Sequence, residues 1–288
     1  MSFHEHEHNL GFIEALPKPA EIDLESFYSR RYFQEEHGGY SNSYTEEELL
    51  HFELDASVAR HIAESFKANE FLLDLGCGEA FFAAAFHRAK WKVQCYDFSS
   101  AGIERCNPQL IGFFRQGNLK DVGKPDWDSD VGLINLSNVL EHVIDPIAIL
   151  TDIRRNLEGN RTILRIVVPN DYSKFQMHLV QRGVTSNTWF VPPEHLSYFN
   201  RTSLLELLSH CGFRILSFQA DFPIEIFLAN PHSNYVRNRK LGKGAHNARV
   251  AIQNFLISTD IDGYIKYAES AGNLGFGRDL VVYATVEE

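Results

Sequence analysis

The stretch LLDLGCGEAF, residues 72–81, decides the fold that the sequence predicts, because an apolar run leads straight into a glycine turn. An apolar run of this kind is typical of a buried strand, and glycines let the backbone turn tightly and approach a ligand closely. The residues after the turn predict a helix. A third glycine is absent, since Phe81 stands three residues after Gly78. The stretch therefore predicts a strand, a turn able to hold a ligand, and a helix.

The chain around this stretch, from Glu70 to about Gln219, alternates short apolar runs with segments of helical period. This alternation is typical of βαβ units and predicts an α/β fold with a doubly wound, mostly parallel sheet. Asp145 before Pro146 predicts one helix start, and Ser203 with Glu206 has the spacing of a capping box. The predicted strands are Phe71–Leu75, Lys92–Tyr96, Ile111–Gln116, Val131–Leu136, Thr162–Val168, Arg214–Phe218 and a last strand, Leu280–Val286.

Three further pieces surround the predicted sheet, and we expect them to cap the edge where open α/β sheets bind ligands. Residues 1–67 form a leader or lid, which begins as a disordered tail, and residues 68–288 form the main domain. Within that domain, residues 171–200 are one insert and residues 220–277 a second, helical insert. The alternative for these pieces is a role in oligomer contacts.

The composition disfavours several classes of protein. The 288 residues are 44% apolar, enough to bury a core, and carry a net charge of −11. Lysine and arginine do not cluster, which disfavours nucleic acid and anionic membranes as partners. No apolar run is long enough to span a bilayer, and the N-terminus lacks the pattern of a secretory signal. The four cysteines lie far apart in the sequence, so we expect reduced thiols in the cytoplasm and neither a disulfide framework nor a zinc site. They are Cys77, Cys95, Cys106 and Cys211.

Polar residues at the ends of the next strands indicate the ligand. Asp97 ends the second strand, where a carboxylate can accept hydrogen bonds from both hydroxyls of a ribose, and Asn118 could read an adenine edge. A dinucleotide such as NAD would need the missing third glycine, and the carboxylate of Glu79 would repel its pyrophosphate. A ligand with a ribose, an adenine and an ammonium group fits better. S-adenosylmethionine is such a ligand.

Four ordered motifs carry a resemblance to a known family: LLDLGCGEA, YDFS, SNVLEHVIDPIAIL and PPEHLSYFNRTSLLELLSHCGF. Together they resemble the class I S-adenosylmethionine-dependent methyltransferases, most closely the small-molecule branch with its ubiquinone-type and sugar-tailoring enzymes. The resemblance covers roughly residues 71–218. It implies a Rossmann-like, seven-stranded sheet whose last strand runs antiparallel beside the sixth. By analogy with family members, residues 171–200 are an insert on the acceptor side, and residues 1–67 form a lid that closes over the cofactor through Tyr32, Tyr40 or Tyr44. The alternative for the leader is an amphipathic arm packed on the domain.

The resemblance also implies the cofactor contacts. Asp74, Gly76 and Gly78 shape the methionine side, and Asp97 takes the ribose. The remaining contacts are Phe98, Asn118 and Leu119 at the adenine and Ser137 beneath the sulfonium. Where the family often has Asp, this chain has Asn118. Because an amide can still meet adenine, this departure bears on cofactor affinity rather than on cofactor identity.

The acceptor is less clearly indicated. A late stretch, DFPIEIFL…GKGAHNAR…GFGRDLVVYATV, resembles methyltransferases found among bacterial polysaccharide-synthesis genes. We therefore expect O-methylation of a sugar, a nucleotide-sugar or a saccharide precursor by a cytoplasmic enzyme that could form oligomers. The alternatives are a quinone-like or lipid acceptor, a cofactor-binding protein without catalysis, and, third, a dehydrogenase.

Two histidines are candidates for a general base that would take a proton from a hydroxyl acceptor. His142 lies six residues past the fourth strand, and His195 lies in the insert after the fifth strand, which in this family faces the acceptor. Imidazole titrates near neutral pH, where a base is most useful. Glu141 and Glu194 could orient either ring. The alternative for both histidines is a structural role, in hydrogen bonding to the backbone or in anchoring a loop.

Overall fold

The fold is a seven-stranded sheet with helices on both faces, seen in a computed structural model that describes residues 2–20, 43–119, 130–157 and 162–286. The strand order is β5-β4-β3-β6-β7-β10-β9. β10 runs antiparallel to both β7 and β9, and the other pairs are parallel, which confirms the expected topology. The strands are β3 (Phe71–Leu75), β4 (Lys92–Asp97), β5 (Phe114–Gln116), β6 (Leu133–Ser137), β7 (Ile163–Pro169), β9 (Phe213–Ala220) and β10 (Asp279–Val286).

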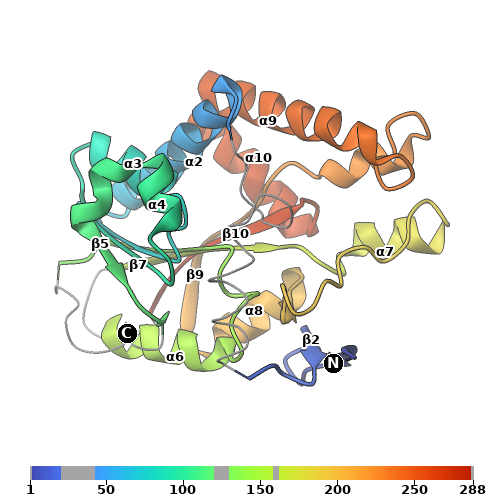
Figure 1. The fold of residues 1–288 in the computed structure, drawn as a ribbon, viewed down its shortest axis with the longest axis horizontal. Coiled ribbons are helices and arrows are strands. Elements are labelled where there is room, and N and C mark those ends of the chain that lie inside the picture. Colours follow the sequence, from blue (N-terminus) through green and yellow to red (C-terminus); the bar gives the residue numbers. More distant parts are fainter. Residues whose placement is uncertain (1, 21–42, 120–129, 158–161, 287–288) are drawn as a thin grey trace.

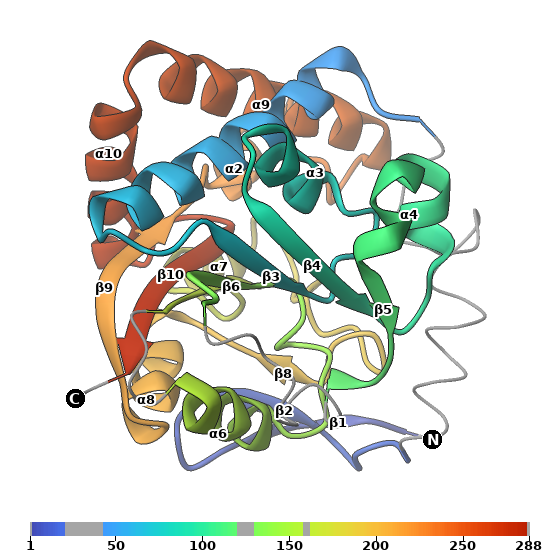
Figure 2. The ribbon, with the colours of Figure 1, turned by 90° about the vertical axis from the view of Figure 1, so that its left-hand side faces the viewer.

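Helices from distant parts of the chain cover the two faces of the sheet (Figures 1 and 2). One face carries α2 (Glu46–Ser65), α3 (Phe81–Arg88), α9 (Gly242–Thr259) and α10 (Ile261–Leu274). The other face carries α6 (Pro146–Leu157) and α8 (Arg201–His210), while α4 (Ala101–Cys106) lies near the β5 edge. Each face has its own apolar core, so the sheet is buried between two layers, as is usual for parallel strands.

The inner strand β3 has the bounds that the sequence predicts, and all five of its residues are buried. The predicted start of α6 is also confirmed, because the side chain of Asp145 accepts a hydrogen bond from the backbone N–H of Ala148 at 3.0 Å. Both outcomes reflect strong local signals. A short apolar run before a glycine turn favours a buried strand, and an Asp-Pro pair favours a helix start.

Two predicted boundaries are wrong by more than the usual uncertainty of about one or two residues at an element's end. The N-cap of α8 is Asn200, which forms a capping box with Ser203, so Ser203 is the third helical residue and not the cap. Asparagine and serine are both good caps, and the choice depends on where the preceding backbone becomes extended. The third predicted strand is also too long, because residues Pro108–Phe113 form a 3-10 helix, η1, and β5 starts only at Phe114.

The start of the leader is ordered, which corrects the expected disordered tail. Residues His4–Glu7 form β1 and residues Ile13–Leu16 form β2, and these strands build a small sheet with β8 (Ser197–Tyr198) in the order β1-β2-β8. Phe12 anchors this sheet, since it is 2% exposed and its ring centroid lies 5.3 Å from that of Phe199. Burial of this aromatic ring explains why a polar leader is held against the domain.

The two inserts follow β7 and β9. The first holds α7 (Lys174–Gln181) and β8, and the second holds α9 and α10 with the 3-10 helices η2 (Ile224–Ala229) and η3 (Arg239–Leu241). The helices expected in the second insert are thus confirmed. Within the described residues, no helix combines the length and apolar character needed to cross a membrane.

Candidate active site

A cavity of about 600 Å³ opens at the carboxyl ends of β3, β4 and β6, within the size range of small-molecule sites. Every residue that the sequence predicts to contact the cofactor lines this cavity: Asp74, Gly76, Gly78, Asp97, Phe98, Asn118, Leu119 and Ser137. Among the described residues His142 lines it as well, whereas His195 does not. The structure therefore brings the predicted cofactor residues together. Of the two histidines, His142 reaches the cavity and His195 does not.

The glycine turn after β3 has a backbone that favours glycine. Gly76 has a φ of +77°, and a side chain there would clash with a methyl carbon of Val139. The backbone N–H groups of Gly76 and Cys77 donate to the carbonyl of Tyr96 at 2.8 and 3.0 Å. These bonds hold the turn against the end of β4. The first glycine is thus required both by conformation and by close packing.

Asp97, at the end of β4, holds the same turn through its side chain. Its carboxylate accepts hydrogen bonds from the backbone N–H of Gly78 at 2.9 Å and of Ser99 at 3.2 Å. Burial raises the pKa of Asp97, and the backbone donors oppose this rise. Asp97 is therefore a structural element of the turn as well as a candidate for ribose binding.

Glu79 is buried in the turn and lies among three donors. Its carboxylate accepts hydrogen bonds from Arg105 Nη2 at 2.5 Å, from the Cys106 thiol at 3.2 Å and from the Tyr44 hydroxyl. Tyr44 also packs edge-on against Phe81, with ring centroids 5.1 Å apart. Of the three tyrosines expected in a lid, Tyr44 thus lies at the cavity wall. The other two, Tyr32 and Tyr40, fall outside the described residues.

A buried polar network, which sequence reasoning missed, lies beneath the turn. Arg165, in the middle of β7, is 1% exposed and donates to both carboxylate oxygens of Asp55 at 2.8 Å. It also donates to Asn135 Oδ1 at 2.8 Å, and Asn135 donates to Asp74 Oδ1 at 2.7 Å. Burial raises the pKa of Asp74 to about 6, against the lowering effects of Asn135 and Arg165. The network links helix α2 to the strand that ends in the glycine turn.

Residues in and next to the second insert form the other half of the cavity. The sequence analysis did not predict their role. Asp221 and Asp279 lie where β9 ends and β10 begins, and Nη1 of Arg249 from α9 lies 3.4 and 3.6 Å from their carboxylates. Gln253 contributes a further polar wall, and its Oε1 is buried without a hydrogen-bond partner among the described residues. This half of the cavity thus presents polar groups from the helical insert.

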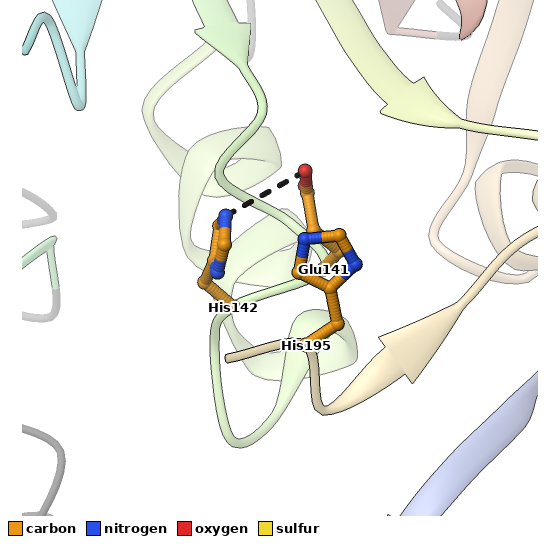
Figure 3. Close-up of side chains that lie close together, drawn as sticks. All are labelled: Glu141, His142 and His195. Carbon is orange, nitrogen blue, oxygen red and sulfur yellow. Dashed lines mark ion pairs between the residues drawn. The ribbon is translucent and has the colours of Figure 1, made fainter. Parts of the chain in front are cut away.

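The two predicted catalytic histidines meet each other, as Figure 3 shows. Their ring centroids lie 4.8 Å apart in an edge-to-face arrangement. The carbonyl oxygen of Glu194 lies 2.6 Å from Nδ1 of His142, and because a carbonyl can only accept, this nitrogen carries the proton. Nε2 of His142 then carries the ring's lone pair and lies 3.7 Å from Glu141 Oε1. The backbone carbonyl of Glu194 thus orients the ring of His142.

Burial governs the charge of this cluster. It lowers the pKa of His142 to about 4 and that of His195 to about 3, and it raises the pKa of Glu141 well above its usual value. Both rings are therefore neutral at neutral pH. Their pKa values lie below the near-neutral value that the sequence predicts for a histidine. Glu141 Oε2 and His195 Nδ1 are buried without a hydrogen-bond partner among the described residues.

The same three residues could hold a divalent ion. Glu141, His142 and His195 each offer one ligand atom, and these atoms all lie within 4.8 Å of one another. Two neutral imidazoles and one carboxylate are a donor set that suits zinc and similar ions.

The charges around the main cavity suit a cationic ligand. Its lining includes two arginines, Arg165 and Arg249, and seven carboxylate side chains: Asp55, Asp74, Glu79, Asp97, Asp145, Asp221 and Asp279. Such an excess of acidic groups disfavours a pyrophosphate and favours the sulfonium and ammonium of S-adenosylmethionine. The residues present therefore fit this cofactor.

Comparisons with known proteins agree with the geometry. The sequence model of a family described as methyltransferase domain matches residues 44–217. A solved structure of the 1,6-didemethyltoxoflavin-N1-methyltransferase of Burkholderia thailandensis, with 1,6-didemethyltoxoflavin and S-adenosylhomocysteine bound, is similar, with a TM-score of 0.55 and 13% identity. The match covers 99% of this chain and 100% of that one.

The plantazolicin methyltransferase BamL, solved with a triazolic desmethylPZN analog and S-adenosylhomocysteine, is also similar. Its TM-score is 0.52 and its identity 14%, over 93% of this chain and 95% of that one. At these identities both structures show a shared fold. No curated protein matches the chain. Since the family model covers more than half of the sequence, the chain belongs to this methyltransferase family and is a class I enzyme whose cofactor is S-adenosylmethionine.

Proposed function

We propose that the enzyme transfers the methyl group of S-adenosylmethionine to a hydroxyl oxygen of a small molecule, a sugar or a saccharide precursor. The observation that carries this proposal is the polar wall of the second half of the cavity, formed by Asp221, Asp279, Arg249 and Gln253. A sugar presents hydroxyl groups that can donate to the carboxylates and to the amide oxygen. A quinone ring or an acyl chain would leave Gln253 Oε1 without a partner, at a cost of about 1–3 kcal/mol.

We propose that the cofactor lies across the glycine turn. Asp97 would accept hydrogen bonds from its ribose, and Asp74 would face its ammonium group. The sulfonium would lie over Ser137. The adenine would lie between Phe98, Asn118 and Leu119. The support for this arrangement is that all of these residues line one cavity at the ends of neighbouring strands.

His142 is the proposed general base. S-adenosylmethionine would supply an activated methyl group, and Nε2 of His142 would take the proton that the acceptor hydroxyl loses as its oxygen receives that methyl, with S-adenosylhomocysteine as the second product. The carbonyl of Glu194, 2.6 Å from Nδ1, holds the ring, and His195 supports it edge-on. With a pKa of about 4 the imidazole is a weak base, but one that is fully deprotonated at neutral pH. Binding of the donor and acceptor in line supplies the larger part of the rate.

The test is methyl transfer itself. The purified enzyme is incubated with methyl-labelled S-adenosylmethionine and a panel of nucleotide-sugars, free sugars and a quinol, and the products are identified by mass spectrometry. Labelled O-methyl sugar supports the proposal, and label on the quinol alone contradicts it. Each reaction is run with and without EDTA, because Glu141, His142 and His195 could hold a divalent ion. Loss of activity in EDTA would assign these residues to metal binding instead of base catalysis.

The cellular setting that we propose is the cytoplasm. The support is that all four cysteines are free thiols, as is usual in a reducing compartment. Thiol titration of the protein purified without reductant tests this point, with all four thiols expected to react after unfolding. Fewer reactive thiols would speak for a disulfide and against a reducing compartment.

A further inference from the structure

A second cavity, of about 370 Å³, lies between α7, η2 and α9, and is built by the two inserts. Trp189 and Glu225 line it, together with Gln176 and Tyr235. Arg249 lines both this cavity and the main one, so the two share a wall. The volume lies at the lower end of the range for small-molecule sites and suits one ring better than a long chain.

Three of the residues that line this cavity each carry a buried side-chain atom without a hydrogen-bond partner among the described residues: Trp189 (Nε1), Glu225 (Oε2) and Arg249 (Nε). The residues Trp189 and Glu225 are themselves buried, at 8% and 6% exposed. Buried polar atoms nearly always have a partner, and each one without a partner calls for an explanation. A ligand that supplies a donor to Glu225 and an acceptor to Trp189 would explain two of them.

The positive charges near this cavity are already paired. Nη1 of Arg278 lies 2.9 Å from Asp171 and 3.7 Å from Glu225, and Arg249 lies between Asp221 and Asp279. A phosphate would have to compete with these carboxylates. The cavity therefore suits a neutral ligand that both donates and accepts hydrogen bonds.

We propose that this second cavity is a saccharide subsite, which holds one ring of the acceptor next to the ring that receives the methyl group. The inference rests on the proposed function and extends it to an acceptor of at least two rings. A sugar ring offers hydroxyl groups to Glu225 and Trp189 along its edge, and its C–H faces pack on aromatic rings such as Tyr235. Gln176, which donates to Glu225 Oε1 at 2.9 Å, holds that carboxylate in place. The shared wall at Arg249 places the two rings on either side of one guanidinium.

The experiment measures binding without requiring methyl transfer. The full chain is labelled with 5-fluorotryptophan and saturated with S-adenosylhomocysteine, and the signal of Trp189 is assigned as the one missing from Trp189→Phe. Methyl glycosides of glucose, galactose, mannose and N-acetylglucosamine are then titrated. At least one should shift the Trp189 signal saturably and leave the signal of Trp91, which is buried in the core beside α3, unchanged.

Two variants and a control locate the binding. Glu225→Gln should weaken the glycoside about tenfold or more, the size expected for a hydrogen bond to a charged group. Tyr235→Phe removes one hydroxyl with little risk to folding and should weaken it less. Glu206→Gln, on the exposed face of α8, should change nothing. Melting temperatures show that each variant is folded.

The outcomes separate this inference from the proposed function. A Trp189 shift without any methylated sugar supports the subsite and contradicts only the proposed reaction. If a sugar is methylated but no glycoside moves the Trp189 signal and Glu225→Gln leaves KM unchanged, the subsite is overturned and the reaction stands. A shift caused by the quinone menadione and by none of the glycosides also overturns the subsite.

Discussion

Replacement of Arg165 by methionine should destabilise the fold by about 3 kcal/mol. Removal of one partner from a buried charged pair costs about 3–5 kcal/mol, because the other partner is left without compensation. Here Arg165 is buried, but the side chain of Asp55 is 40% exposed, so its carboxylate keeps part of its hydration and the lower end applies. Methionine fills most of the volume. Asn135 would lose the donor to its Oδ1, which adds to the loss.

The assay is urea unfolding, with Arg155→Met as the matched control. Arg155 and Asp152 lie 2.9 Å apart, close to the distance in the buried pair, but their side chains are 70% and 44% exposed. An exposed pair contributes about 0–1 kcal/mol, so the control should lose little stability. The Arg165 variant should also bind S-adenosylhomocysteine more weakly, because the charge of Arg165 lowers the pKa of Asp74. Equal losses of stability in the two variants would refute the reasoning.

Three further predictions concern the site. Asp97→Ala should weaken the binding of S-adenosylhomocysteine, measured by calorimetry, by about 1.5–3 kcal/mol. It should also lower the melting temperature of the free enzyme, because the Asp97 carboxylate accepts a hydrogen bond from the backbone N–H of Gly78. A variant with unchanged melting temperature and unchanged affinity would contradict both roles. At pH 6, binding of S-adenosylhomocysteine should release about half a proton, because the pKa of Asp74 is about 6 and the ammonium group of the ligand would lower it. Identical binding enthalpies in buffers of different ionisation enthalpy would speak against this release. The lowered pKa values of His142 and His195 mean that the unfolded chain binds more protons between about pH 4 and 6.5, so these rings reduce stability as the pH falls through that window. The urea midpoint of His142→Asn should therefore fall less than that of the wild type between about pH 7 and 5, and an equal fall would remove the basis for a neutral buried ring.

The residues that we propose for cofactor binding could be expected from the sequence to meet in one place, because several of them follow directly on strands. Asp74 and Gly76 are fixed by β3, Asp97 ends β4 and Ser137 ends β6, and parallel strands bring their carboxyl ends to one edge. A local pattern was therefore enough to name residues that meet in space.

The rest could not be predicted, because it depends on contacts between distant residues. Arg165 stands in a run that is otherwise typical of an apolar strand, and its partner Asp55 is 110 residues away. The strand β1 has four exposed residues and is ordered through its pairing with β2. Neither contact leaves a signal within a short window of sequence.

The crystal structure of the enzyme with S-adenosylhomocysteine tests the central claim most directly. The account predicts both ribose hydroxyls within hydrogen-bond distance of the Asp97 carboxylate, and the sulfur facing Ser137 on the side where His142 lines the cavity. A ribose bound away from Asp97, or a sulfur on the far side of the cavity from His142, would contradict it.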